Sequence, residues 1–194
     1  MPRVEACILA GGLSSRMGQD KAKLKLGGKS LLAHARAAAI SAGLPVRVIR
    51  HDLVPRCGPL GGVYTALQTT RAEIVVFLSC DMPFVTPAVL EGLLAKLAPD
   101  ADAVFSGEDK PGFPFVLRAT ALTQVKELLR CQRFALSGLA RALRASLVST
   151  SGANSLAAVN VNTPSEYSEA KRMLKSRRLT RPGELRRSER PQRD

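Results

Sequence analysis

The hydrophobic positions of this chain alternate between short continuous apolar runs and longer stretches with helical spacing. Short apolar runs bounded by glycine, proline and polar residues are typical of strands buried on both faces of a sheet. Six segments have this character, namely residues 4–10, 46–50, 74–79, 103–106, 115–118 and 158–161. Because helical patterns separate most of these runs, the chain is predicted to form βαβ units, and hence an α/β fold with a mostly parallel sheet.

The helical patterns cover residues 31–42, 61–70, 87–97, 121–130, 137–145 and 164 to about 176. Ser30 has the side chain of an N-cap for the first helix, and Gly43 is a typical helix stop. The last helix begins with a capping box, in which Thr163 is the N-cap, Pro164 is the first helical residue and Glu166 comes three residues after the cap. Right-handed crossovers are expected to place helices on both faces of the sheet.

The end of the chain differs from the rest in charge. Residues 175–194 hold 8 of the 29 Lys and Arg and 3 of the 16 Asp and Glu, which is +5 of the net charge of +13. Their only large aliphatic side chains are Leu179 and Leu185, so this segment cannot bury a face. We therefore expect one domain over residues 1–176 and a basic, disordered tail over residues 177–194.

The composition is that of an ordinary folded domain, with 45% apolar and 23% charged residues among 194. No apolar run is long enough for a membrane span, and the first apolar stretch is too short for a signal peptide. We therefore expect a cytoplasmic protein. The tail lacks the aromatic residues that single-strand-binding surfaces use for stacking. The positive charge is thus better explained by a small polyanionic substrate, such as a nucleotide, than by a specific nucleic acid.

The cysteines and the first histidine are expected to be structural. The four cysteines are too far apart in the sequence for a zinc or thioredoxin-like site. Free cysteines behave as small hydrophobic residues, so we expect mostly buried thiols at Cys7, Cys57, Cys80 and Cys131. His34 lies within the first predicted helix, where a single histidine more often packs than reacts.

A glycine-rich loop follows the first predicted strand. Its sequence from Leu9 to Lys21, LAGGLSSRMGQDK, holds three glycines and two serines, whose backbone N–H groups can approach phosphates closely. Arg16 and Lys21 add positive charge. The loop has neither the GxGxxG pattern nor a Walker A pattern, since Lys23 stands where the latter needs a glycine. The residue types alone therefore leave two interpretations open, a phosphate cradle and a turn with solvated charges.

The longer stretch LAGGLSSRMGQDKAKLKLGGKSLL resembles, almost letter for letter, the signature loop of molybdenum cofactor guanylyltransferases, nucleotidyltransferases that make molybdopterin guanine dinucleotide. Four further motifs resemble that family in the expected order: GPLGG at 58–62, CDMP at 80–83, Phe113-Pro114, and VNVNTP at 159–164. The resemblance covers residues 4 to about 174. It implies a single Rossmann-like, three-layer α/β domain of the nucleotidyltransferase type.

The resemblance also assigns roles to particular residues. Asp81 follows a buried strand, so it lies at the carboxyl end of the sheet, where open α/β folds bind ligands. In the family this aspartate binds Mg²⁺. The catalytic residues would be Arg16, Lys21 and Asp81, and the nucleotide would be bound by Leu9, Ala10, Gly11, Lys21, Asp52 and Asp81.

Three other assignments are less direct. The glycine-rich turn at 58–62 resembles the segment that closes over the base. The family's second aspartate, counted back from that turn, falls on His51, one place before Asp52. Asn160 and Asn162 flank Val161 on the expected last strand and would point to one face, either toward the metal or the pterin or as a polar edge.

The implied reaction is the transfer of GMP from GTP to the phosphate of the molybdopterin-bound molybdenum cofactor, with Mg²⁺ as cofactor and pyrophosphate as product. Two alternatives stay open. One is a related nucleotidyltransferase with another nucleotide or acceptor, of the cytidylyltransferase or sugar-1-phosphate type. The other is a non-catalytic nucleotide-binding partner of a molybdoenzyme. A molybdoenzyme or a cofactor-insertion protein would be a further partner, whereas neither a membrane nor a specific nucleic acid is expected.

One segment is shorter than the family pattern. Only fourteen residues separate Gly43 from Gly58, where the family fits a strand, a short helix and a second strand. Because fourteen residues hold one strand and one loop, we expect residues 46–50 to pair directly with residues 4–10. The sheet would then be one strand smaller than the family's, with a thinner pocket wall and weaker base selectivity.

Overall fold

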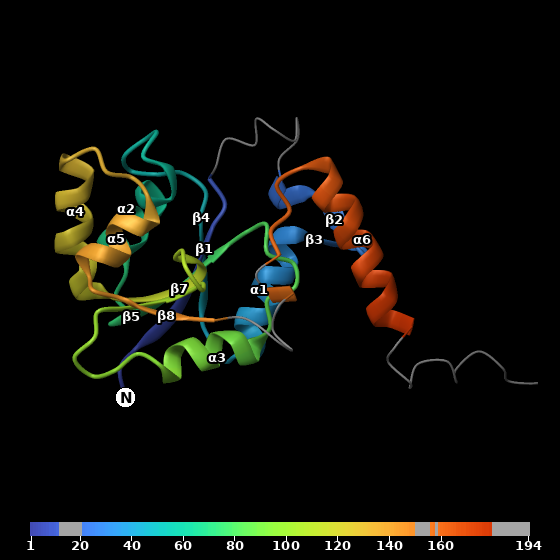
Figure 1. The fold of residues 1–194 in the computed structure, drawn as a ribbon, viewed down its shortest axis with the longest axis horizontal. Helices are drawn as coiled ribbons and strands as arrows, with labels where there is room; N and C mark the ends of the chain where they lie inside the picture. Colours follow the sequence, from blue (N-terminus) through green and yellow to red (C-terminus); the bar gives the residue numbers. More distant parts are fainter. Residues whose placement is uncertain (12–20, 150–155, 158, 180–194) are drawn as a thin grey trace, which may run out of the picture.

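The structure is a computed structural model that describes residues 1–11, 21–149, 156, 157 and 159–179. Its centre is a six-stranded sheet with the strand order β4-β1-β5-β7-β6-β8 (Figure 1). The strands are β1 (Val4–Leu9), β4 (Val46–Ile49), β5 (Ile74–Ser79), β6 (Ala103–Ser106), β7 (Gly112–Arg118) and β8 (Ser146–Val148). Only β7 runs antiparallel to its neighbours among these strands, so the prediction of a mostly parallel α/β sheet is confirmed.

The helices lie on both faces of the sheet and at one side of it. They are α1 (Leu31–Ser41), α2 (Gly58–Thr69), α3 (Pro87–Ala95), α4 (Leu122–Arg130), α5 (Leu136–Ala142) and α6 (Pro164–Leu179), with short 3₁₀ turns η1 (Lys21–Lys23) and η2 (Ala119–Ala121). A two-stranded hairpin, β2 (Lys25–Leu26) and β3 (Lys29–Ser30), packs against α6 beside the main sheet (Figure 1). Within the described ranges, no helix has the length and hydropathy to cross a bilayer.

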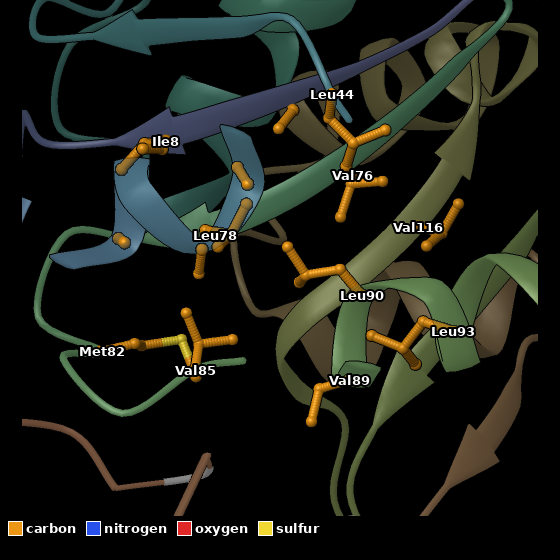
Figure 2. Packing of buried hydrophobic residues seen from close by; sticks show 14 of the residues in the cluster. Ile8, Leu44, Val76, Leu78, Met82, Val85, Val89, Leu90, Leu93 and Val116 are labelled. Atoms are coloured by element: carbon orange, nitrogen blue, oxygen red, sulfur yellow. The ribbon is translucent and has the colours of Figure 1, made fainter. Parts of the chain in front are cut away.

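Alternation along the central strands produces two separate cores. On β1, Ala6 and Ile8 face α1 and α3, whereas Cys7 faces the layer of α2, α4 and α5. On β5, Val76 and Leu78 belong to the first core, whereas Val75 and Phe77 belong to the second. Figure 2 shows the first core, where the leucines of α3 lie beneath the aliphatic side chains of the sheet. Successive strand residues point to opposite faces, so one uninterrupted apolar strand can serve both layers.

The short segment after α1 pairs with the first strand, as predicted. β4 pairs in parallel directly with β1, with Ala6 opposite Val46 and Leu9 opposite Ile49. Gly43 adopts a positive φ of 72° at the end of α1, and the chain then needs only two residues, Leu44 and Pro45, to enter β4. This short connection leaves no room for another strand between α1 and β4. In the described sheet, β4 is the edge strand and β1 is its neighbour.

Most predicted elements are confirmed within a few residues, but the expected last strand is wrong. Val159, Asn160 and Val161 are not in a strand, and Ala158 lies outside the described residues. The Val161 N–H donates to the Asp81 carbonyl oxygen at 3.0 Å, which ties this segment to the loop after β5 rather than to a strand ladder. Sequence analysis also missed β8 and the β2–β3 hairpin, whose two or three residues per strand are too few to establish an alternation.

Several helix ends are also corrected. α2 begins at Gly58 rather than at residue 61, and α5 ends at Ala142 rather than at residue 145. α6 runs to Leu179, three residues past the predicted end. The remainder of the predicted tail, from residue 180 on, lies outside the described residues, so the domain boundary stays a prediction.

The residues predicted to be structural behave accordingly. All four cysteines are free thiols, and Cys131 alone among them is exposed. Burial raises the pKa of the Cys7 thiol to about 12, so it stays protonated at neutral pH. His34 Nε2 lies 2.8 Å from the Leu26 carbonyl oxygen, which ties α1 to the β2–β3 hairpin.

Candidate active site

A cleft of about 880 Å³ opens at the carboxyl ends of β1 and β4. This volume suits a nucleotide-sized ligand. The end of β1, the segment after β4, the start of α2 and the end of β5 supply most of its lining, which includes Leu9, Gly11, Arg50, His51, Asp52, Arg56, Gly58, Pro59, Gly62, Ser79 and Phe113. Three of the predicted nucleotide-binding residues, Leu9, Gly11 and Asp52, therefore line the cleft, whereas Ala10, Lys21 and Asp81 do not.

The GPLGG motif forms one wall of this cleft as the first turns of α2, not as the expected turn. Two of its glycines allow close packing. A Cβ atom on Gly61 would lie 2.9 Å from both Asp52 Oδ2 and the Val54 carbonyl oxygen, and one on Gly62 would lie 3.1 Å from the Leu9 side chain. Both contacts are closer than ordinary van der Waals distance. Glycine at 61 therefore lets the segment after β4 lie against α2, and glycine at 62 lets the Leu9 side chain of β1 pack closely on the same helix.

The charged residues of the cleft come from that same segment. Burial raises the pKa of Asp52, and the neighbouring His51 opposes this shift. Both residues line the cleft, but Asp52 is the one whose carboxylate packs against α2. Arg50 and Arg56 also line the cleft, and sequence analysis missed them. No motif contains them, so the basic character of residues 50–56 is the one signal that could have indicated them.

A second polar group lies beside the cleft. The Lys21 ammonium, on η1, donates to Asn162 Oδ1 at 2.7 Å and lies 3.8 Å from Asp81 Oδ2. Asp81 follows β5 and is 9% exposed. Its second oxygen, Oδ1, is buried and has no hydrogen-bond partner within the part of the chain that the structure describes. A buried carboxylate oxygen in this state suits a cationic ligand.

The two polar regions are adjacent because β1 and β5 are neighbours. The Cys80 N–H donates to the Leu9 carbonyl oxygen at 3.1 Å, which continues the pairing of the two strands beyond their ends. Leu9 and Ser79 line the cleft, and Asp81 follows Ser79 by two residues. The arrangement can thus hold one part of a ligand in the cleft and a negatively charged part near Lys21 and Asp81.

Asn160 and Asn162 have different positions. Asn162 contacts Lys21, whereas Asn160 is exposed. The expectation that both point to one face of a strand is therefore wrong, because this segment is not a strand. Arg16, predicted to be catalytic, lies outside the described residues.

Asp81 is the candidate metal ligand among the described residues. No group of three or more His, Cys, Asp or Glu residues gathers in the described ranges. A single carboxylate is the protein ligand that Mg²⁺ typically uses when substrate phosphates and waters supply the other positions. The residues present therefore fit Mg²⁺ held jointly with a nucleotide.

Comparison with known proteins agrees with this arrangement. Residues 6–151 match the family described as the MobA-like NTP transferase domain. The chain is 34% identical over 175 residues to the molybdenum cofactor guanylyltransferase of Xanthomonas euvesicatoria, covering 83% of this chain and 90% of that protein. It is 28% identical over 202 residues to a probable molybdenum cofactor guanylyltransferase of Pelotomaculum thermopropionicum, covering 93% and 98%.

A solved structure shares the fold. Molybdopterin-guanine dinucleotide biosynthesis protein A from Archaeoglobus fulgidus superposes with a TM-score of 0.72 at 20% identity, covering 89% of this chain and 99% of that one. At this identity the similarity establishes the fold alone. The matched family covers most of the chain, including the greater part of β1, the cleft and Asp81. This chain belongs to the MobA-like NTP transferase family.

Proposed function

We propose that this protein transfers the guanylyl group of GTP to the terminal phosphate of the molybdopterin-bound molybdenum cofactor. Membership of the MobA-like family supports nucleotidyl transfer, and the Xanthomonas relative, named a molybdenum cofactor guanylyltransferase, supports the choice of nucleotide and acceptor. The observation that carries the proposal is the buried Asp81 carboxylate, with one oxygen unpartnered among the described residues, beside Lys21 and next to a nucleotide-sized cleft.

The reaction needs positioning and charge neutralisation more than covalent chemistry. An oxygen of the acceptor phosphate attacks the α-phosphorus of GTP, the bond from that phosphorus to the bridging oxygen breaks, and pyrophosphate leaves with the bonding electrons. The Lys21 ammonium neutralises phosphate charge, and Asn162 orients it through the 2.7 Å hydrogen bond. Leu9, Gly11 and the first turns of α2 hold the nucleoside part in the cleft.

Asp81 is the residue that would hold Mg²⁺, through the oxygen that lacks a partner in the described part of the chain. When bound, Mg²⁺ would neutralise phosphate charge near Asp81 and Lys21. Arg16 is proposed to neutralise the departing pyrophosphate, on the resemblance of its loop alone.

A nucleotide panel tests the proposal. Purified protein, Mg²⁺ and molybdopterin are incubated with GTP, ATP or CTP, and pyrophosphate release is measured. We expect GTP to be the best substrate, with a preference below about a hundredfold, roughly 2.7 kcal/mol, because the short segment before α2 leaves a thinner pocket wall.

Other results would favour the alternatives. A preference for CTP would indicate a cytidylyltransferase. Pyrophosphate release that requires a sugar 1-phosphate instead of molybdopterin would indicate a different acceptor. Nucleotide binding without any pyrophosphate release would indicate a non-catalytic partner of a molybdoenzyme.

A further inference from the structure

The capping box of α6 makes one more hydrogen bond than a helix N-terminus requires. As predicted, the Glu166 N–H donates to Thr163 Oγ1 at 3.2 Å, and Glu166 Oε2 accepts from the Thr163 N–H at 2.8 Å. The same Oε2 also accepts from the Asn162 N–H at 2.7 Å. Asn162 precedes the cap, so this third bond fixes a residue outside the helix.

Asn162 is the residue whose side chain holds Lys21. Its Oδ1 accepts from the Lys21 ammonium across a sequence separation of 141 residues. Glu166 therefore holds the backbone at Asn162, and the side chain of Asn162 holds the ammonium that faces Asp81. The Asn162 N–H is the main reason that the pKa of Glu166 is lowered, so Glu166 is ionised at neutral pH and its bonds are charge-assisted.

Independent contacts anchor α6 to the domain. On the helix itself, Ala170 is buried in a small core with Leu26 and Leu31, and the Tyr167 hydroxyl donates to the Lys25 carbonyl oxygen. Figure 1 shows α6 standing beside α1 and the β2–β3 hairpin. Because α6 is anchored elsewhere and the Val161 N–H is held by the Asp81 carbonyl oxygen, loss of the Glu166 carboxylate would loosen Asn162 itself without undocking α6.

We propose that Glu166 is a positioning residue for nucleotidyl transfer, which acts on the reacting phosphates only through Asn162 and Lys21. This inference rests on the proposed function. It makes the first turn of α6 part of the active site, although no residue of that turn is among the described residues that line the cleft.

The chain offers two matched controls for Glu166→Ala. Thr163→Ala removes the other half of the same cap, so it should cost a similar amount of stability while it keeps the bond from Asn162 N–H. Glu169→Ala removes an exposed glutamate from the same helix. Each variant is compared with wild type for melting temperature, for kcat/KM with GTP, Mg²⁺ and molybdopterin, and for the calorimetric Kd of GTP with Mg²⁺.

We expect Glu166→Ala to lower kcat/KM about tenfold and to raise the Kd for GTP about threefold, because the phosphate-binding ammonium loses its fixed position. Glu166→Gln, which keeps an acceptor oxygen, should restore part of both. Thr163→Ala should match the melting temperature of Glu166→Ala but stay within about twofold of wild type in kcat/KM. Glu169→Ala should be unchanged in all three measurements.

The path through Asn162 is tested by a double-mutant cycle. In an Asn162→Ala background, Glu166→Ala should cause little further loss, since the connection is already broken. Equal activity loss in Thr163→Ala and Glu166→Ala, or full additivity with Asn162→Ala, would overturn the proposal.

The same experiment separates the two hypotheses. If wild type binds GTP but releases no pyrophosphate, the proposed function fails, and the Kd values alone decide whether Glu166 positions Lys21. If wild type neither binds nor transfers GTP, the positioning role is overturned together with the function.

Discussion

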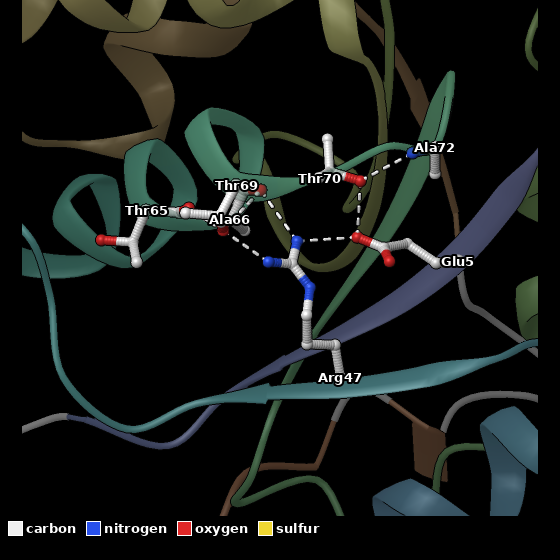
Figure 3. Close-up of polar contacts among 7 residues, drawn as sticks. All are labelled: Glu5, Arg47, Thr65, Ala66, Thr69, Thr70 and Ala72. Carbon is white, nitrogen blue, oxygen red and sulfur yellow. Dashed lines mark hydrogen bonds and ion pairs between the residues drawn. The ribbon is translucent and has the colours of Figure 1, made fainter.

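Two partly buried ion pairs join distant parts of this chain, and they are satisfied to different degrees. Arg47 on β4 lies 2.7 Å from Glu5 on β1, and it also donates to the Thr69 hydroxyl and to the Ala66 carbonyl oxygen on α2 (Figure 3). The Thr70 hydroxyl donates to the same Glu5 oxygen at 2.7 Å. Among the Arg47 nitrogens, Nε alone is left without a partner in the described ranges.

The second pair is looser. Lys21 and Asp81 are 3.8 Å apart, beyond hydrogen-bond distance, although the Lys21 side chain is less exposed than that of Arg47 and the Asp81 side chain is less exposed than that of Glu5. The first pair uses its donors and acceptors to hold β4, β1 and α2 together. In the second pair, Asp81 Oδ1 accepts no hydrogen bond from the described residues. Each pair leaves one buried atom without a partner in the described ranges, Arg47 Nε in the first and Asp81 Oδ1 in the second. A cation can bind only to the carboxylate oxygen, so we propose that the first pair is structural and that the second binds a ligand.

The largest expected effect comes from Asp81→Asn. We expect kcat to fall more than about a hundredfold, roughly 2.7 kcal/mol in the barrier, because the substitution removes the charge of the expected metal ligand and keeps its shape. Pyrophosphate release measures the effect, and circular dichroism checks folding. Asp109→Asn, an exposed aspartate, is the matched control. Retention of more than about a tenth of wild-type kcat would contradict the metal-binding role.

Lys21→Ala should have the next largest effect. We expect kcat/KM for GTP to fall about thirtyfold, because the variant lacks the ammonium held between Asn162 and Asp81. Lys23→Ala and Lys25→Ala remove exposed lysines from the same segment and should stay within about threefold of wild type. Equal losses in all three variants would indicate a general basic patch rather than a positioned contact.

Arg47→Met should sharpen the contrast by affecting stability instead of chemistry. We expect the free energy of unfolding in urea to fall by about 2 kcal/mol, since the half-buried Glu5 carboxylate loses its main partner. The kcat/KM per folded molecule should remain near wild type. Arg130→Met, which breaks an exposed pair with Glu127, is the control and should leave the free energy of unfolding nearly unchanged. A large loss of activity in fully folded Arg47→Met protein would contradict a purely structural role for the Arg47–Glu5 pair.

The smallest effect is expected at Asp52. Burial raises the pKa of its carboxyl above the unfolded value, so the ionised form reduces stability once the pH rises through the folded pKa. Asp52→Asn should therefore raise the melting temperature slightly at pH 7, and this gain should vanish when the pH falls below the unfolded pKa of an aspartate. Melting curves at both pH values test it. A lower melting temperature for the variant at pH 7 would mean that the Asp52 charge stabilises the fold.

Several features follow from local sequence alone, and the structure confirms them. Ser30 Oγ accepts from the Ala33 N–H at 3.1 Å, as its N-cap position predicts, and the box at Thr163 and Glu166 forms as expected. β5 has the predicted limits because an apolar run between polar residues has few other solutions. The position of β4 beside β1 could be predicted from a count of residues, because the fourteen residues between Gly43 and Gly58 cannot hold a second strand as well.

Other features depend on contacts between segments far apart in the chain. Arg50 and Arg56 line the cleft only because β4 ends beside β1, and no local pattern indicates this. The VNVNTP segment has the apolar alternation of a strand, but its Val161 is buried against the hairpin and α6 instead of in the sheet. Short apolar alternation shows that a face is buried and leaves open which partner buries it.

The candidate site shows most clearly which features local sequence determines and which depend on the tertiary structure. The sequence identifies Lys21, Asp81 and Asn162 as chemically suitable, through a glycine-rich loop, a strand end and a motif before a helix. Their meeting depends on the pairing of β1 with β5 and on the docking of α6 against the β2–β3 hairpin. Helix caps and hydrophobic periodicity depend on residues a few positions apart, so they can be predicted from the sequence. A contact across 141 residues forms only when the packing of all intervening elements brings its two ends together.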